Sequence, residues 1–131
     1  MDNSLKTGQY LLDVLNDNDD LIEALGEDKI WPLAARENTL YPFVIYNRDV
    51  PQITYTKQIG HDNIINITYR VFSTDYDEGL NIANIIRNTL ERKTINFENE
   101  IKINDIWVQS VFETFAEDAF CQTIVFRMMV E

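Results

Sequence analysis

The residue types that most often carry catalysis or bind metals are few and scattered in this 131-residue chain. Its one histidine, His61, lies beside Asp62 in a polar turn, and its one cysteine, Cys121, lies in an apolar strand pattern. A His–Asp pair needs a nucleophile within reach, and the spacing assigns none to His61. One His and one Cys also do not fill a tetrahedral zinc site. We interpret His61 as an exposed loop residue and Cys121 as a small buried apolar side chain.

Carboxylates are the other candidates for chemistry, because the chain contains 22 acidic residues. Glu113, Glu117 and Asp118 lie near an expected hairpin turn, where they could bind a cation or act as acid and base. The simpler interpretation of these residues is a solvated loop tip. The run Asn16–Asp20 offers aspartate ligands for calcium, but it lacks the Gly and Glu spacing of an EF-hand, so a turn and a helix cap are favoured.

No phosphate-binding signature is present, since neither GxGxxG nor GxxxxGK[ST] occurs in the sequence. Trp31 and Trp107 could stack on a ligand, but tryptophans are more common as core or interface anchors. The sequence therefore indicates no catalytic residue, no cofactor and no metal site. We expect that the protein is not an enzyme, with carboxylate chemistry around Glu113 as the least favoured hypothesis.

The charge limits the partners that the protein can have. The formal net charge is −11, and the 11 basic residues are scattered except for the pair Arg92 and Lys93. Binding to phosphate backbones requires clustered Lys and Arg, so sequence-specific nucleic-acid binding is not expected. The acidity suits solubility, a surface that DNA slides past, or a surface that meets a basic partner.

Length and hydropathy indicate one domain over residues 1–131, because a chain of this size with 45% hydrophobic residues can bury a core. The polar start of the chain does not resemble a secretory signal, and no apolar run approaches the ~20 residues needed to cross a bilayer. We expect a cytoplasmic protein without a membrane segment.

Periodicity predicts three helical pieces. Ser4 is a candidate cap for a short amphipathic helix, which the polar run Asn16–Asp20 interrupts. Asp19 or Asp20 can cap a second short piece that ends at Gly26. Asp75, with Glu78 three residues later, has the spacing of a capping box at the start of a third helix. The apolar stripe of that helix comprises Tyr76, Leu80, Ala83, Ile86 and Leu90, broadened by Ile82 and Ile85.

Alternation predicts four main strands. The clearest has Ile65, Ile67, Tyr69 and Val71 on one face, and the others cover Phe43–Tyr46, Ile101–Phe112 and Thr123–Val130. Ile53–Thr56 is a further short extended piece, whereas Ile30–Thr39 and Thr94–Glu100 are expected to be irregular. The expected fold is α+β, with a mainly antiparallel sheet of about four strands flanked by two helices in the order α-β-β-α-β-β.

The C-terminal hairpin has a second apolar face. Assuming regular alternation, that face carries Trp107, Val111, Val125 and Met129. Helices and loops that cover both faces of the sheet would explain it. The functional alternative is a subunit interface, because exposed apolar patches mark association sites. These four residues are our candidate subunit interface.

The order of the motifs resembles the tail completion and tail terminator proteins of long-tailed bacteriophages and prophages. The resemblance rests on Leu11–Leu15 before a polar break, on Ile30-Trp31-Pro32, on the strand Tyr41–Tyr46, on the link Phe72–Glu78 between a long strand and a helix, and on the closing hairpin with Phe126. It extends from about Leu5 to Val130, and its motifs are structural rather than catalytic.

This resemblance implies a structural subunit that caps the tail tube or joins the tail to the head. Relatives assemble as a ring, usually a hexamer, which contacts the tail tube protein and the head connector proteins. The family has no catalytic residues to transfer to this chain. The implied location is the bacterial cytoplasm during assembly and the virion tail of an intact phage. The alternative function is a small acidic protein-binding module, such as an inhibitor or a DNA mimic.

Overall fold

The computed structural model describes residues 6–27, 29–52, 63–97 and 101–130. Within them lie three helices, α1 (Thr7–Asn16), α2 (Asp19–Leu25) and α3 (Tyr76–Leu90). The strands are β1 (Ile30–Pro32), β2 (Phe43–Gln52), β3 (Asn63–Ser73), β4 (Ile95–Phe97), β5 (Ile101–Ala116) and β6 (Ala119–Val130). They form one sheet in the order β1-β2-β3-β6-β5-β4, in which β1 and β2 are parallel and the other neighbours antiparallel.

The expected sheet of about four strands flanked by two helices is therefore wrong. The structure has six strands in one mixed sheet and three helices, in the order α-α-β-β-β-α-β-β-β. The strands β1 and β4, in segments expected to be irregular, are three residues long, which is too short for alternation to reveal. Both exist because they pair with the longer strands β2 and β5. The predicted cap Ser4, the extended piece Ile53–Thr56 and His61 lie outside the described residues.

The polar run between the first two helices acts as predicted, although with a different cap. The Asn18 side chain, rather than Asp19 or Asp20, accepts a hydrogen bond from the Leu21 amide at 3.1 Å. Gly26 ends α2 as expected, with a φ of 89° that a residue with a Cβ adopts only with strain. The result is two short helices joined by a two-residue turn.

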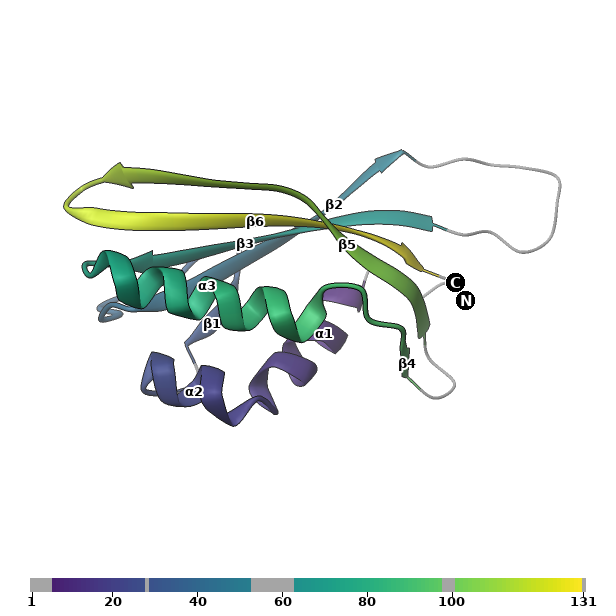
Figure 1. Ribbon diagram of the computed structural model, residues 1–131, viewed down its shortest axis with the longest axis horizontal. Helices are drawn as coiled ribbons and strands as arrows, with labels where there is room; N and C mark the ends of the chain where they lie inside the picture. The colour runs from purple at the N-terminus through teal and green to yellow at the C-terminus, as the bar shows by residue number, and fades with distance from the viewer. Residues whose placement is uncertain (1–5, 28, 53–62, 98–100, 131) are drawn as a thin grey trace, which may run out of the picture.

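All three helices lie on the same face of the twisted sheet (Figure 1). The predicted alternation of β3 is confirmed, since Ile65, Ile67, Tyr69 and Val71 are all at most 1% exposed. They face the helices and join one core with the buried side chains of the helices, which include Leu11, Leu15, Leu21, Leu25, Ile82, Ile86 and Leu90. Among the described residues, the sheet thus has one face that the helices cover and an open face on which no helix lies.

The long helix α3 begins at the predicted cap. The Asp75 side chain accepts from the amides of Asp77 and Glu78, which satisfies two of the free donors of the first turn. The Glu78 carboxylate accepts instead from the Ser73 hydroxyl at 2.8 Å. Two members of the predicted apolar stripe, Tyr76 and Leu80, do not join the core, because each is 39% exposed.

Candidate subunit interface

Three of the four predicted interface residues share the sheet face without helices. Strand pairing sets Trp107 opposite Arg127 and Val125 opposite Ser110, and Met129 lies on the same side of β6 as Val125. All three side chains are half-buried by their neighbours on this open face. Their use as an interface stays a prediction, but the structure brings them together as alternation indicated.

The fourth residue, Val111, lies on the opposite face. The β5–β6 register shifts between Val108 and Ser110, and beyond this irregularity Val111 pairs with Ile124. Ile124 is 2% exposed and points to the helix side, whereas Val111 is 50% exposed. An extra residue in one strand inverts which face each later side chain occupies. Val111 therefore does not contribute to the surface of Trp107.

The open face also holds an aromatic group that the sequence did not single out as a site. The ring of Phe43 lies 5.1 Å from that of Phe72 and 5.3 Å from that of Tyr41, measured between centroids. Trp31 extends the group at 6.4 Å from Phe43, and the Arg36 guanidinium lies 6.0 Å above the Trp31 ring. The signal was available, because Phe43 and Phe72 alternate with the buried residues of β2 and β3.

The outer edge of β5 is partly unpaired. β4 pairs only with residues 101–103, and the Arg92 amide then donates to the Ile106 carbonyl at 2.6 Å. Beyond Ile106, none of the described strands pairs with this edge. The same stretch carries Val111, Phe112 and Phe115, which are 50%, 50% and 59% exposed. Free strand edges and exposed apolar side chains both favour association with another chain.

Two of the three candidate carboxylates form the hairpin turn at the end of β5. Ala116 pairs with Ala119, so Glu117 and Asp118 form a two-residue loop with φ of 52° and 63°. Positive φ at both positions is what a type I′ turn requires, and it matches the twist of the flanking strands. Both side chains are exposed at the end of the molecule. We define residues 115–118 as the hairpin tip.

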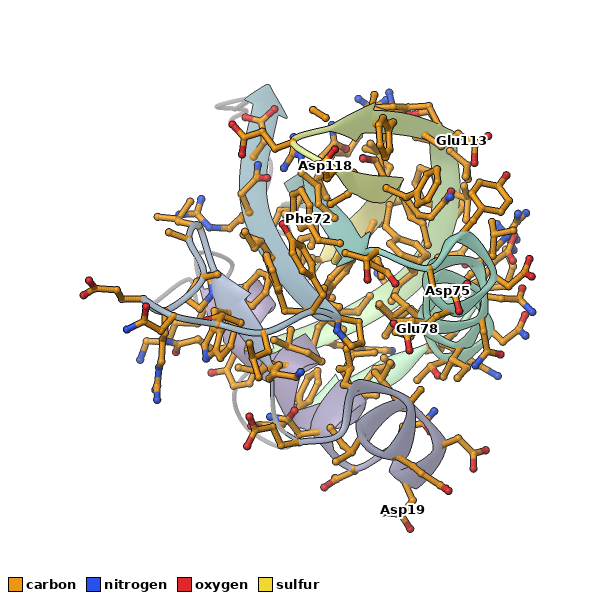
Figure 2. All side chains as sticks on the ribbon, turned by 90° about the vertical axis from the view of Figure 1, so that its left-hand side faces the viewer. Asp19, Phe72, Asp75, Glu78, Glu113 and Asp118 are labelled. Carbon is orange, nitrogen blue, oxygen red and sulfur yellow. The ribbon has the colours of Figure 1, made fainter. Side chains whose placement is uncertain are left out.

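The third candidate carboxylate, Glu113, links the hairpin to α3. Its Oε2 accepts from Gln122 Nε2 at 2.9 Å and from the Tyr76 hydroxyl at 2.8 Å. The hydrogen bond from Gln122, followed by the one from Tyr76, lowers the pKa of Glu113, whereas a general acid needs a raised pKa. Figure 2 shows Glu113 on the side of α3 and Asp118 away from it. The three carboxylates therefore do not converge.

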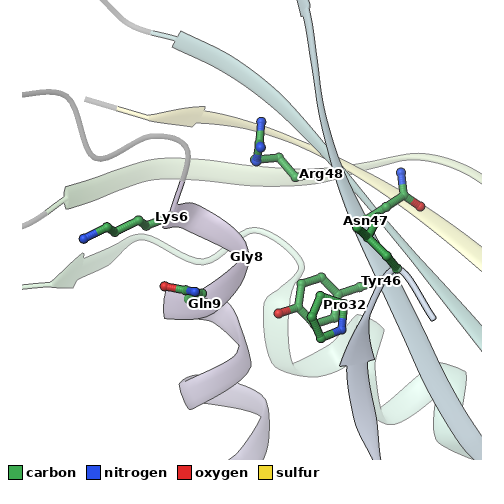
Figure 3. Close-up of a pocket in the computed structure, with 8 residues that line it drawn as sticks. Lys6, Gly8, Gln9, Pro32, Tyr46, Asn47 and Arg48 are labelled. Atoms are coloured by element: carbon green, nitrogen blue, oxygen red, sulfur yellow. The ribbon is translucent and has the colours of Figure 1, made fainter. Parts of the chain in front are cut away.

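A cleft of about 300 Å³ lies between the start of α1 and the strands β1 and β2 (Figure 3). We call it the α1–β2 cleft, and its lining comprises Lys6, Gly8, Gln9, Pro32, Leu33, Tyr46, Asn47 and Arg48. A Cβ on Gly8 would lie 2.9 Å from a ring carbon of Tyr46, so glycine is what lets the ring approach α1. Burial, followed by the Asp13 carboxylate, raises the pKa of Tyr46 and keeps its hydroxyl a neutral donor.

The remaining described candidates for chemistry, Cys121, Asp19 and Asp20, lie where their side chains support the fold. Cys121 is buried, with its sulfur 3.6 Å from the Thr123 hydroxyl. Asp19 and Asp20 occupy the first turn of α2, where negative charge suits the helix dipole. In the described ranges no group of three His, Cys, Asp or Glu side chains could hold a metal ion. No described helix is long and apolar enough to span a membrane.

Comparison with known proteins gives a fold relative. The structure superimposes on a chain from the solved virion of a native gene transfer agent particle with a TM-score of 0.76. The alignment covers 91% of this chain and 90% of that chain at 16% sequence identity. The two chains therefore share a fold, and that fold occurs in a virion particle. No protein family and no curated protein matches the sequence.

Proposed function

We propose that this protein is a structural subunit of a phage or prophage tail, which caps the tail tube or joins the tail to the head as part of an oligomeric ring. The observation that carries the proposal is the fold shared with a virion chain over nearly the full length of both chains. The sequence resemblance to tail completion and tail terminator proteins supports the same role. In this proposal the partners are further copies of the chain, the tail tube protein and the head connector proteins.

The surface chemistry supports a role in assembly rather than in catalysis. Exposed apolar side chains gather on the β5 edge and on the β1–β2 loop, where Leu33 and Leu40 are each 78% exposed. Such side chains are stabilised when another protein surface covers them. We propose that the protein has no catalytic activity and that its cellular location is the bacterial cytoplasm during assembly, then the virion tail.

The described sheet surface does not favour the alternative of a DNA mimic. A mimic needs carboxylates in rows at phosphate-like spacing. The centre of the open sheet face instead carries Arg70 and Arg127, which donate hydrogen bonds to Asn47 at 2.6 Å and to Asn66 at 3.1 Å. An assembly subunit is therefore the function that these residues support best.

A direct test measures assembly of the purified full chain. Light scattering over a wide concentration range should show an oligomer, or electron microscopy should show the protein bound at the ends of tail tubes assembled from the tube protein of the same genome. A chain that stays monomeric at every concentration and leaves the tube ends unoccupied would refute the proposed function.

A further inference from the structure

The hairpin tip is an acidic and apolar projection. Glu117 and Asp118 are exposed at the turn, and Phe115, which is 59% exposed, precedes Glu117 by two residues. The Phe115 ring packs against Phe120 at a centroid distance of 4.9 Å, and Phe120 contacts Tyr76 at 5.3 Å. One side of the tip is thus held against the start of α3, while its two carboxylates project into solvent.

The α1–β2 cleft has the opposite character. Lys6 and Arg48 are exposed at its rim, and neither belongs to the ion pairs that the described residues form, Arg87–Glu91 and Arg92–Asp105. Leu33 adds an apolar side chain that is 78% exposed, next to Pro32 and the ring of Tyr46. A cationic rim around an apolar floor is unusual on a chain with a net charge of −11.

The tip cannot reach the cleft of its own chain. Pairing across the sheet sets Arg48 level with Ile67, Phe126 and Val108, whereas the turn of the tip lies between the paired residues Ala116 and Ala119. The seven strand steps from Phe126 to Ala119 correspond to roughly 23 Å at about 3.3 Å per residue. β3 and β6 also separate β2 from β5. In Figure 1 the tip forms the left end of the sheet, while α1 begins towards the right.

We infer that the hairpin tip of one copy docks in the α1–β2 cleft of the next copy, with Glu117 and Asp118 facing Lys6 and Arg48 and with Phe115 covering Leu33. This inference rests on the proposed function and names the contact between subunits. Each contact uses the tip of one copy and the cleft of another, so successive copies can associate head to tail, and the series closes into a ring if the rotation per subunit permits.

Electrostatics favours this contact over one between two tips. Two copies that each carry a charge of −11 repel overall, so a contact that brings unlike charges together is favoured. A symmetric contact between two tips would place the carboxylates of both copies against each other. The tip-to-cleft contact instead offers two carboxylates to two cations and covers exposed apolar surface on both sides.

Charge reversal on the full chain tests the contact. The tip variant is Glu117→Lys with Asp118→Lys, and the cleft variant is Lys6→Glu with Arg48→Glu. Each alone should weaken self-association, measured by sedimentation velocity, about tenfold or more, because like charges then face each other. A mixture of the two variants should recover association, since every contact between one variant and the other again pairs unlike charges. The matched control, Asp17→Lys with Glu23→Lys, makes the same charge change as the tip variant at exposed positions near α2.

Each outcome has a distinct meaning. Weakened variants, an unaffected control and recovery in the mixture support the contact. If both variants associate like the wild type, or if the mixture stays dissociated, the contact is refuted while the proposed function stands. A wild type that neither associates alone nor binds tail tube ends refutes the contact and the proposed function together.

Discussion

The turn at the hairpin tip allows folding and assembly to be changed in opposite directions by one variant. Glu117 and Asp118 have φ of 52° and 63°, in the left-handed region that costs a residue with a Cβ roughly 1–2 kcal/mol. Replacing them by Asn-Gly, the preferred type I′ pair, relieves much of this cost. The greater freedom of glycine in the unfolded chain offsets about 0.4–1 kcal/mol. We expect Glu117→Asn with Asp118→Gly to stabilise the fold by about 1 kcal/mol.

This gain is measurable for a chain of this length. An unfolding entropy of about 2.1 cal/mol/K per residue converts 1 kcal/mol into a rise in Tm of about 4 °C for 131 residues. Thermal and urea unfolding, followed by circular dichroism at low protein concentration, would measure it. The same variant removes both carboxylates, so we expect its self-association in sedimentation velocity to weaken while its stability increases.

A neutral pair that keeps the side chains serves as the matched control. Glu117→Gln with Asp118→Asn also removes the charges but leaves two residues with a Cβ in the turn. It should weaken association to a similar degree with a smaller gain in Tm. An Asn-Gly variant that is no more stable than the wild type would refute the argument from backbone conformation. One that associates like the wild type would show that the carboxylates lie outside the contact.

Three further predictions concern single side chains. The Tyr69 hydroxyl is buried without a hydrogen-bond partner among the described residues, so Tyr69→Phe should raise the free energy of unfolding by about 1–2 kcal/mol in urea titrations. Burial also raises the pKa of Tyr69, so tyrosine ionises first in the unfolded chain, above pH ~10. The wild type should therefore lose stability above this pH more steeply than Tyr69→Phe. Equal slopes of unfolding free energy against pH would contradict this. Asp75→Ala should cost about 1 kcal/mol in thermal unfolding through loss of the α3 cap, whereas Asp75→Ser should retain most of it. NMR titration should find the pKa of Glu113 below its ordinary value, so the contribution of Glu113 to stability is lost as the pH falls through that pKa. Tyr76→Phe removes one of the two hydrogen bonds and should raise the pKa of Glu113. A pKa of Glu113 that Tyr76→Phe leaves unchanged would refute this hydrogen bond.

Several elements were predictable because their signals are local. The alternation of Ile65, Ile67, Tyr69 and Val71 fixed the buried face of β3, and Asp75 marked the start of α3. A side chain that caps a helix bonds to amides two or three residues away, so the neighbouring sequence contains the whole interaction. Gly26 is similar, since a left-handed residue after a helix favours glycine wherever the helix packs.

The short edge strands and the candidate interface were harder to predict from the sequence. β1 and β4 depend on pairing with β2 and β5, and three residues carry no readable period. Regular alternation grouped Val111 with Trp107, but the irregularity near Val108 moves Val111 to the other face. A bulge is a property of two paired strands, so one strand's sequence does not reveal it. The α1–β2 cleft was also missed, because Lys6, Leu33 and Arg48 are distant in the chain.

The sequence by itself determined where most helices and long strands lie and which residues of β3 face the core. These features follow from side-chain period and from contacts within a few residues. Tertiary structure decided that the described helices cover one face of the sheet, that part of the β5 edge pairs with no described strand, and that a cationic cleft lies far from an acidic hairpin tip. These features depend on which distant segments become neighbours, and the free energy that selects those neighbours comes from burying the whole core at once.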